Sequence, residues 1–181
     1  MNKTVKRMSF IAMYIAIAVI LDYLKTNFLP FLNMPFGGSI NIALIPVVVA
    51  SFHLGIADGL ITGFLWWLIT TLLGLNPWIV NAGQYLLDYI IPSCVVGLAS
   101  IFYKKRTLLE IELGVLLVMV LRTLSVVVSG AYFWVEDTVV AGSWPAWVAS
   151  FAYNGTYNIM SCVMLLIVIP IIVRSIRKYL I

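Results

Sequence analysis

Charged residues are scarce in this chain, and their scarcity argues against a water-soluble fold. Only 10% of the 181 residues are Asp, Glu, Lys or Arg, whereas 63% are hydrophobic. Soluble domains have about 25% charged and about 45–50% apolar residues. A soluble protein of this length could not bury so much apolar surface, but a bilayer solvates it. The composition therefore predicts an integral membrane protein.

Motifs for bond-making chemistry are also missing. The sequence contains no GxxxxGK[ST] phosphate loop, no HExxH, no GxSxG and no metal-ligand spacing. Cys94 and Cys162 form no CxxC or Cys/His cluster, and buried Cys mostly behaves as a small hydrophobic residue. The only histidine, His53, is expected at a membrane interface. We therefore expect no enzyme activity, no metal and no cofactor, and an intramembrane enzyme is the least supported class.

Six apolar stretches are long enough to cross a bilayer as helices, which takes about 17–25 residues. Pro, Gly and polar residues separate them, except at HLGIADG, where the second and third stretches nearly merge. One long re-entrant segment is the alternative interpretation there. We predict an all-α, six-helix membrane bundle that forms a single transmembrane domain over residues 1–181, with spans at 8–29, 40–57, 58–75, 79–103, 108–133 and 146–173.

Basic residues predict the orientation of these spans. They precede the first span, join the fourth to the fifth and follow the sixth: Lys3, Lys6, Arg7, Lys104, Lys105, Arg106, Arg174, Arg177 and Lys178. With six spans these places share one side, which the positive-inside rule assigns to the cytoplasm. Both termini are therefore predicted to be cytoplasmic. No small-residue cleavage site follows the first span, so we expect it to be retained, and the net charge of +4 gives no support for nucleic-acid binding.

Polar side chains within four spans fall at a similar predicted depth. At about 1.5 Å of rise per residue, Asp88 lies roughly 14 Å below the outer end of the fourth span and Arg122 roughly 20 Å above the inner end of the fifth. These depths nearly coincide in a hydrocarbon core about 30 Å thick. Asp22 in the first span and Asn154 in the sixth reach the same layer.

Helical spacing places these polar residues on single helix faces. The three sets are Asn81, Gln84 and Asp88; Arg122, Ser125 and Ser129; and Ser150, Asn154 and Asn158. Such faces turn inward because lipid offers their groups no hydrogen-bond partner. They predict a shared polar pocket toward the outer side. The alternative is an internal network in which an Asp88–Arg122 ion pair only holds the helices together.

Aromatic residues gather in the same outer half, including Trp78, Tyr85, Tyr89, Trp134, Tyr153 and Tyr157. Most are expected to form the interfacial belt that is usual for membrane Trp and Tyr. A subset turned inward beside Asp88 and Asn154 would form a cage for a flat ligand, including a cationic one.

Four stretches occur in a characteristic order: FGGSINIALIP after the first span, LLDY in the fourth, SGAYFW at the end of the fifth and YNGTY in the sixth. In order and spacing they resemble the thiamine-specific substrate-binding subunits (S components) of energy-coupling factor (ECF) vitamin importers, over nearly the whole chain. The resemblance implies a subunit of the bacterial plasma membrane that binds the vitamin from outside. Its implied partners are a transmembrane coupling subunit and two ATPases, which would account for the missing phosphate loop.

The resemblance also implies roles for single positions. Asp88 matches the acidic residue that bonds the aminopyrimidine ring of the substrate, Trp134 a ring-stacking aromatic residue, and Asn154 an amide ligand. Trp66 falls at an aromatic position of the third helix. The candidate substrate-binding set is Asn41, Trp66, Gln84, Tyr85, Asp88, Arg122, Trp134, Asn154 and Asn158.

Small residues suggest two kinds of helix contact. Ala12 and Ala16, in AMYIA, match the AxxxA patch through which the family docks on the coupling subunit, and small side chains permit such close helix approach. Gly55, Gly59 and Gly63 are instead expected to form contacts within this protein.

Two positions depart from the thiamine pattern. Val126 stands where a His is expected and Ala149 where a Tyr is expected. A pyridine vitamin such as pyridoxine therefore remains an alternative substrate. An alternative of another class is a self-sufficient secondary transporter or channel that uses Asp22, Asp88 and Arg122 as an ion path. Inverted repeats would favour that class, and none is recognisable.

Overall fold

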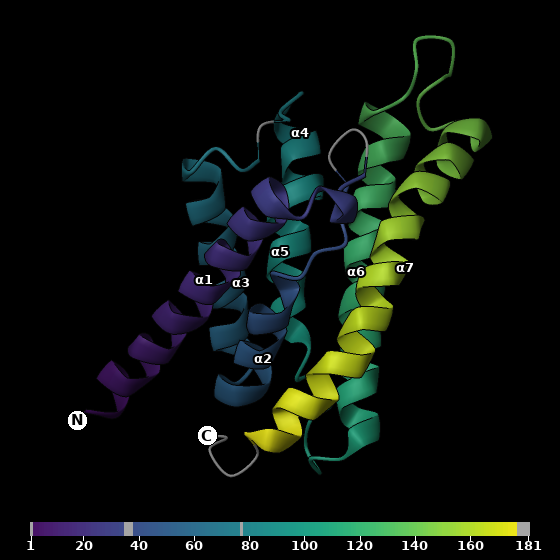
Figure 1. Ribbon diagram of the computed structural model, residues 1–181. Helices are drawn as coiled ribbons and strands as arrows, with labels where there is room; N and C mark the ends of the chain where they lie inside the picture. The colour runs from purple at the N-terminus through teal and green to yellow at the C-terminus, as the bar shows by residue number, and fades with distance from the viewer. Residues whose placement is uncertain (1, 35–37, 77, 177–181) are drawn as a thin grey trace.

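The computed structural model describes residues 2–34, 38–76 and 78–176, and these form six helical rods (Figure 1). Three rods are single long helices: α1 (Lys3–Phe28), α6 (Leu108–Phe133) and α7 (Trp144–Ser175). By length and composition, these three are apolar enough to cross a bilayer. Two rods are shorter: α2 (Leu44–Leu54) and α3 (Ile56–Leu72). The last joins α4 (Ala82–Tyr85), η3 (Leu86–Ile90), α5 (Ile91–Val95) and η4 (Val96–Leu98).

Each rod corresponds to one predicted span, so the all-α six-helix bundle is confirmed. The bounds of α6 agree with the sequence pattern, and its start has a capping box formed by Thr107 and Glu110. The uncertain junction between the second and third spans falls at Gly55, whose φ of 96° suits a residue without a Cβ. Two helices therefore stand where one re-entrant segment was the alternative.

The second rod is shorter than its predicted span of 40–57. α2 has 11 residues and rises about 16 Å, roughly half the thickness of the hydrocarbon core. Residues 38–43 lead into it without forming a helix. The Asn41 N–H donates to Ser161 Oγ of α7, and the Ala43 N–H donates to Asn41 Oδ1, both at 3.0 Å. Non-helical backbone is tolerated at membrane depth where protein groups bond it, and here Ser161 and Asn41 do so.

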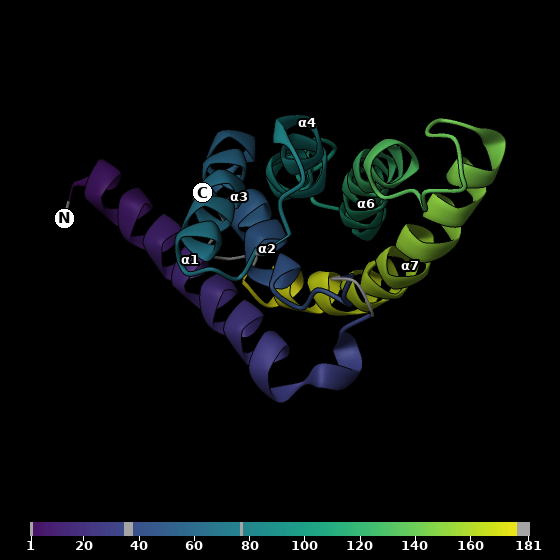
Figure 2. The ribbon, with the colours of Figure 1, turned by 90° about the horizontal axis from the view of Figure 1, so that it is seen from above.

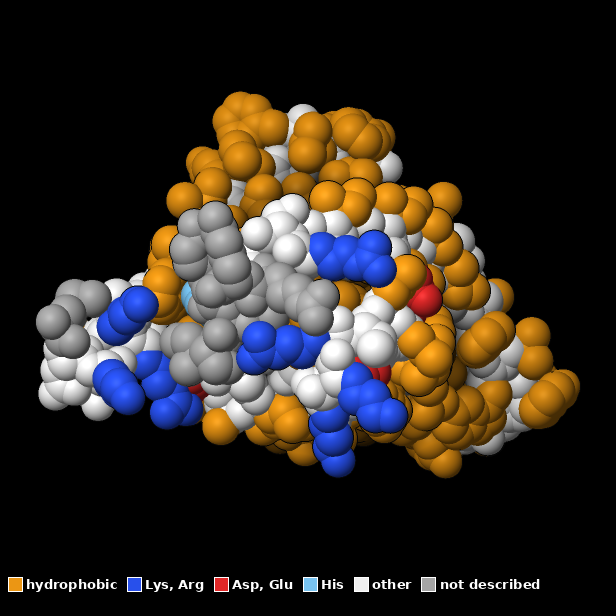
Figure 3. Space-filling model, turned by 90° about the horizontal axis from the view of Figure 1, so that it is seen from below, with side chains coloured by type: hydrophobic (Ala, Val, Ile, Leu, Met, Phe, Trp, Pro, Cys, Tyr) orange, Lys and Arg blue, Asp and Glu red, His pale blue; other side chains and the backbone are white. Residues whose placement is uncertain are grey.

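The connections between helices lie at the two ends of the bundle. α1 begins and α7 ends at the lower end of Figure 1, where the 99–107 connection and the α2–α3 turn also lie. Lys and Arg side chains gather on this face (Figure 3). The described residues thus agree with the predicted topology, while the assignment of this face to the cytoplasm stays a prediction. Arg177 and Lys178, which entered that prediction, lie outside the described residues.

Seen from above, α1 crosses the bundle at a slant and α7 bends along one side, with α6 packed closely against α7 (Figure 2). Two polar contacts connect α1 to its neighbours. Arg7 forms an ion pair with the buried Asp58 of α3, and Tyr14 Oη is 2.8 Å from His53 Nδ1 of α2. His53 is only 5% exposed, so it packs inside the protein near the end of α2, and its interfacial depth stays a prediction.

Glycines allow α3 to approach the fourth rod closely. A Cβ on Gly63 would lie 2.2 Å from the Ser93 carbonyl oxygen, and one on Gly59 would lie 2.6 Å from that of Gly97. The predicted contacts within the protein are therefore confirmed for Gly59 and Gly63. Gly55 differs because no heavy atom lies within 4 Å of its added Cβ, and it serves the turn.

Candidate ligand-binding site

Asp88 lies in an irregular stretch of the fourth rod. Leu86–Ile90 is a π-helical turn, a rare form that occurs frequently at functional sites. Pro92 has no N–H, so it cannot donate to the carbonyl of Leu87 or Asp88. The Leu87 carbonyl instead accepts a hydrogen bond from Ser125 Oγ of α6 at 2.6 Å. Proline thus makes the local helix irregular, and α6 supplies the missing donor.

Two donors hold one oxygen of the Asp88 carboxylate. Gln84 Nε2 donates to Oδ2 at 2.7 Å and Trp134 Nε1 donates to the same oxygen at 2.8 Å. The orientation of the Gln84 amide is fixed because its Oε1 accepts the Val80 N–H at 3.0 Å. Both of these hydrogen bonds go to Oδ2, and the buried Ser129 hydroxyl of α6 also lies beside the carboxylate.

Arg122 does not pair with Asp88. The ion pairs among the described residues are Arg7–Asp58 and Lys25–Asp22. Arg122 Nη1 donates to the Pro92 carbonyl at 2.9 Å, and Arg122 Nε is buried without a hydrogen-bond partner. The Asp88–Arg122 ion pair on which the alternative interpretation rests is therefore absent from the described residues.

Asn154 on α7 is part of a third group. Its Nδ2 donates to the Ser150 carbonyl at 3.1 Å, and its Oδ1 accepts a hydrogen bond from Tyr157 Oη at 2.6 Å. α6 can approach this group because Gly130 faces it, and a Cβ there would lie 2.1 Å from Ser150 Oγ. The amide is therefore oriented by its own helix, with one acceptor site of Oδ1 left for a ligand.

The other candidate residues are distributed around these groups. Tyr85 Oη is 2.8 Å from Thr71 Oγ1 of α3, and Asn158 Nδ2 donates to the Asn154 carbonyl at 2.9 Å. Asn41 bonds the start of α2, as described above. Trp66 is 3% exposed and its Nε1 has no hydrogen-bond partner. Asn81 does not face inward with Gln84 and Asp88, since it is exposed and caps α4.

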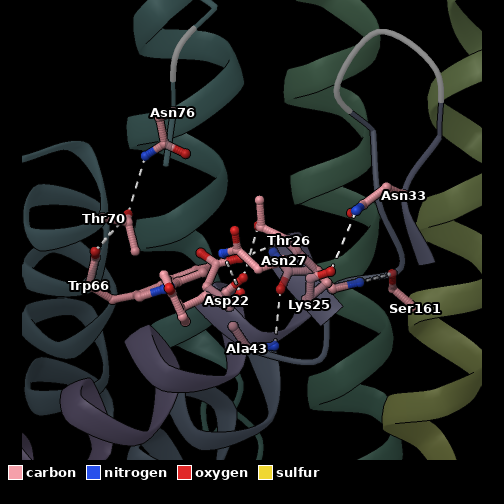
Figure 4. A network of polar contacts seen from close by, with 12 residues as sticks. Asp22, Lys25, Thr26, Asn27, Asn33, Ala43, Trp66, Thr70, Asn76 and Ser161 are labelled. Carbon is pink, nitrogen blue, oxygen red and sulfur yellow. Dashed lines mark hydrogen bonds and ion pairs between the residues drawn. The ribbon is translucent and has the colours of Figure 1, made fainter. Parts of the chain in front are cut away.

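Sequence reasoning missed the burial of Lys25. Lys25 Nζ donates to Asp22 Oδ1 at 2.6 Å, and both residues are 7% exposed. In Figure 4 the pair lies at the centre of a polar network, with the Trp66 indole directed toward it from α3. The i,i+3 spacing of two opposite charges on one helix face was a signal that could have found the pair.

One open pocket of ≈ 230 Å³ lies at the other end of the bundle, where the basic residues gather. α2, α3 and the 99–107 connection line it, with Ser51, Ser100 and Arg106 among its residues. None of the candidate ligand residues lines it. We place the candidate site at Asp88, because polar side chains from three rods converge there and several of them, such as Gln84 and Asn154, are buried.

Comparison with known proteins identifies the family. Residues 8–181 match the family model described as thiamine transporter protein (Thia_YuaJ). The chain belongs to this thiamine transporter family. It is 32% identical over 179 residues to the thiamine transporter ThiT of Bacillus subtilis (strain 168), covering 93% of this chain and 90% of that protein. The predicted resemblance is thereby confirmed, as is the expectation of a multi-pass membrane transport protein and not an enzyme.

The fold agrees with a solved member of the family. The structure of ThiT from Listeria monocytogenes superimposes with a TM-score of 0.78 at 22% identity, covering 98% of each chain. Membership holds although Val126 and Ala149 depart from the expected ligand pattern. Val126 is buried on α6, whereas Ala149 is exposed on α7. A tyrosine at position 149 would begin on the outer surface of α7, so its absence leaves no gap in the interior.

Proposed function

We propose that this protein is the thiamine-binding S component of an energy-coupling factor importer. The observation that carries this proposal is the arrangement at Asp88, in a chain that belongs to the thiamine transporter family. Gln84 and Trp134 hold Oδ2, and the carboxylate accepts a further hydrogen bond from the amino group of an aminopyrimidine. Hydrogen bonds of charged acceptors are about twice as strong as neutral ones, so this carboxylate is the main polar anchor of the site.

The remaining candidates divide by their contacts. We assign direct ligand contact to Asp88, Trp134, Asn154, Arg122 and Trp66, which present a free acceptor, a ring face or an unpartnered donor. Gln84, Tyr85, Asn41 and Asn158 have polar groups engaged with neighbouring residues. They act on the ligand by positioning these neighbours. The Trp134 indole, bonded to Asp88 and 42% exposed, offers a face for stacking beside the anchored ring.

The exposed side of α1 supports a docking role for Ala12 and Ala16. Both alanines are exposed, while Tyr14, Ile15 and Ala18 are buried against the bundle. The small residues thus face outward, where a coupling subunit can approach α1 closely. Two ATPases bound to that subunit would supply the energy, since this sequence has no phosphate loop.

Titration of the purified subunit tests the substrate. We expect one thiamine per chain to bind without ATP or an ion gradient, and the isolated pyrimidine fragment to bind more weakly because it lacks the second ring. Pyridoxine serves as the comparison ligand. Tighter binding of pyridoxine than of thiamine would replace the proposed substrate, and binding of none of the three would remove the vitamin assignment.

Reconstitution tests the energy source. Liposomes that contain the subunit with its coupling subunit and ATPases should take up thiamine when ATP is enclosed with the ATPase domains. Liposomes with the subunit alone, under a proton or sodium gradient, should take up none. Gradient-driven uptake by the subunit alone would instead establish the secondary transporter.

A further inference from the structure

Arg122 has fewer hydrogen-bond partners than its chemistry requires. A guanidinium carries five N–H donors and no acceptor. Nη1 donates to the Pro92 carbonyl, while Nε is buried and has no partner among the described residues. A buried guanidinium N–H without an acceptor is costly within a membrane protein, so Arg122 has the capacity to bind one further acceptor.

The neighbouring carboxylates each accept hydrogen bonds from donors other than Arg122. Asp22 and Asp88 both lie close enough to interact with Arg122 electrostatically. Asp22 accepts from Lys25 at 2.6 Å, and Asp88 accepts from Gln84 and Trp134. Neither carboxylate reaches Arg122 as an ion pair in the described part of the chain. A further buried group near Asp22, the unpartnered indole N–H of Trp66, is also a donor (Figure 4).

The charge balance around Arg122 also favours a bound anion. Asp22, Lys25, Asp88 and Arg122 contribute two negative and two positive formal charges. A thiazolium ligand adds one positive charge to this set. Net charge in a low-dielectric interior is costly unless a counter-charge accompanies it. A small anion beside the free side of Arg122 would satisfy the guanidinium and neutralise the occupied site.

We propose that Arg122 forms an anion subsite on the inner side of Asp88, which a small anion occupies through the free guanidinium donors and which the cationic ligand makes more favourable. Two sources share the required chemistry: a small inorganic anion such as chloride, and a phosphate group carried by the ligand itself. The ligand in this proposal rests on the proposed function, but the presence of an anion at Arg122 can be measured without any vitamin.

Bromide gives the vitamin-independent measurement. Crystals of the wild-type protein grown or soaked in bromide should show an anomalous-scattering peak within hydrogen-bond distance of the Arg122 guanidinium. Arg122→Gln should lack this peak. Arg174→Gln, which removes an exposed arginine at the end of α7, should keep it. If thiamine fails to bind the wild type, the proposed function fails, and the bromide peak still decides the subsite.

Anion replacement measures the consequence for binding. Exchange of chloride for gluconate at constant ionic strength should weaken thiamine binding by the wild type and by Arg174→Gln about 10- to 150-fold, the range of one charge-assisted hydrogen bond. Arg122→Gln should bind equally in both salts. Arg122→Lys keeps the positive charge and should retain part of the chloride effect. This second variant keeps the test decisive if Arg122→Gln fails to fold.

Binding of thiamine monophosphate distinguishes a free inorganic anion from a phosphate group carried by the ligand. Thiamine monophosphate should bind the wild type equally in chloride and gluconate if its phosphate fills the subsite, and Arg122→Gln should lose affinity for the ester more than for thiamine. Either source acting through Arg122 supports the proposal. A wild type with no bromide peak, and with no chloride or phosphate effect that depends on Arg122, overturns it.

Discussion

The two halves of the bundle differ in what they bury. Toward the end where α6 begins, most buried side chains are apolar, among them Val48, Val115 and Leu165, which are fully buried. The buried polar residues there, such as Ser51 and Asp58, already bond protein groups. In the half around Asp88 the buried side chains are mostly polar, among them Gln84, Ser129, Asn154 and Asn158. Apolar burial needs close packing alone, whereas polar burial needs a hydrogen bond for each group. Several buried groups of the second half, such as the Arg122 Nε and the Ser129 hydroxyl, have no hydrogen-bond partner among the described residues. A ligand can bind to such groups.

The backbone contacts differ between the two halves as well. In the apolar half, helices touch through glycines, and a Cβ on Gly114 of α6 would lie 1.8 Å from the Ala99 carbonyl oxygen. In the polar half, the Leu87 carbonyl in the π-helical turn at Asp88 accepts a hydrogen bond from the Ser125 side chain of α6. The comparison indicates that substitutions in the first half should affect stability, and those in the second should affect binding.

The largest effects are expected when either of two glycines on α6 is replaced by alanine. Gly114→Ala forces a methyl group against the backbone of Ala99, which cannot rotate away, and should lower the free energy of unfolding by about 3 kcal/mol. Gly130→Ala meets side-chain atoms of Ser150 and Asn154 and should chiefly reduce thiamine affinity, because it displaces the Asn154 amide. Thermal unfolding of both variants measures the loss of stability, and ligand titration measures the loss of affinity. Equal loss of stability without loss of affinity in Gly130→Ala would contradict the division.

Asp88→Asn should reduce thiamine affinity about 10- to 150-fold, because it removes a charge-assisted hydrogen bond. Its melting temperature should change little, since no ion pair with Arg122 is broken. Loss of a buried ion pair would cost about 3–5 kcal/mol of stability instead. Asp137→Asn, in the exposed α6–α7 loop, is the matched control. Unchanged affinity in a destabilised Asp88→Asn would make the carboxylate structural.

Trp134→Phe should have a smaller effect on affinity, roughly 2- to 12-fold, because it keeps a stacking ring and removes one hydrogen bond worth about 0.5–1.5 kcal/mol. Trp134→Ala should lose more, since the ring face goes as well. Titration of both variants separates the two contributions. If Phe and Ala are equally impaired, the ring face makes no contact with the ligand.

Ala12→Leu and Ala16→Leu should leave thiamine affinity unchanged while abolishing ATP-driven uptake, because a bulky residue keeps the coupling subunit from close approach. Ile20→Phe alters the same exposed side of α1 without a small residue being lost, and it should preserve uptake. Binding assays and reconstituted transport are compared for the three variants. A fall in affinity would place the alanines in contacts that support the bundle itself.

Cysteine labelling should change neither stability nor affinity, and it decides which half faces outward. In a background without Cys94 and Cys162, an impermeant thiol reagent added to whole cells should label Thr138→Cys but not Lys3→Cys. The expectation follows from the basic residues at the end where α1 begins. The reverse labelling would invert the topology and place the Asp88 half on the cytoplasmic side.

The amino-acid sequence by itself determined the properties that depend on local pattern. Apolar length predicted six rods and the bounds of α6, and helical spacing predicted that Gln84, Asp88 and Asn154 face inward. Composition and periodicity are sufficient for these inferences because each helix forms its own backbone hydrogen bonds in a bilayer. The residue identities shared with the thiamine transporter family added the class of transporter.

Only the tertiary structure decided which groups meet. Asp88 bonds Gln84 and Trp134 and not Arg122, Lys25 is buried beside Asp22, and the segment before α2 bonds α7 without forming a helix. Each of these outcomes depends on rotations and shifts of about one ångström between helices, because a hydrogen bond fails beyond a narrow range of distance and angle. Periodicity fixes the face on which a side chain lies, and the packing of neighbouring helices decides the atom it reaches.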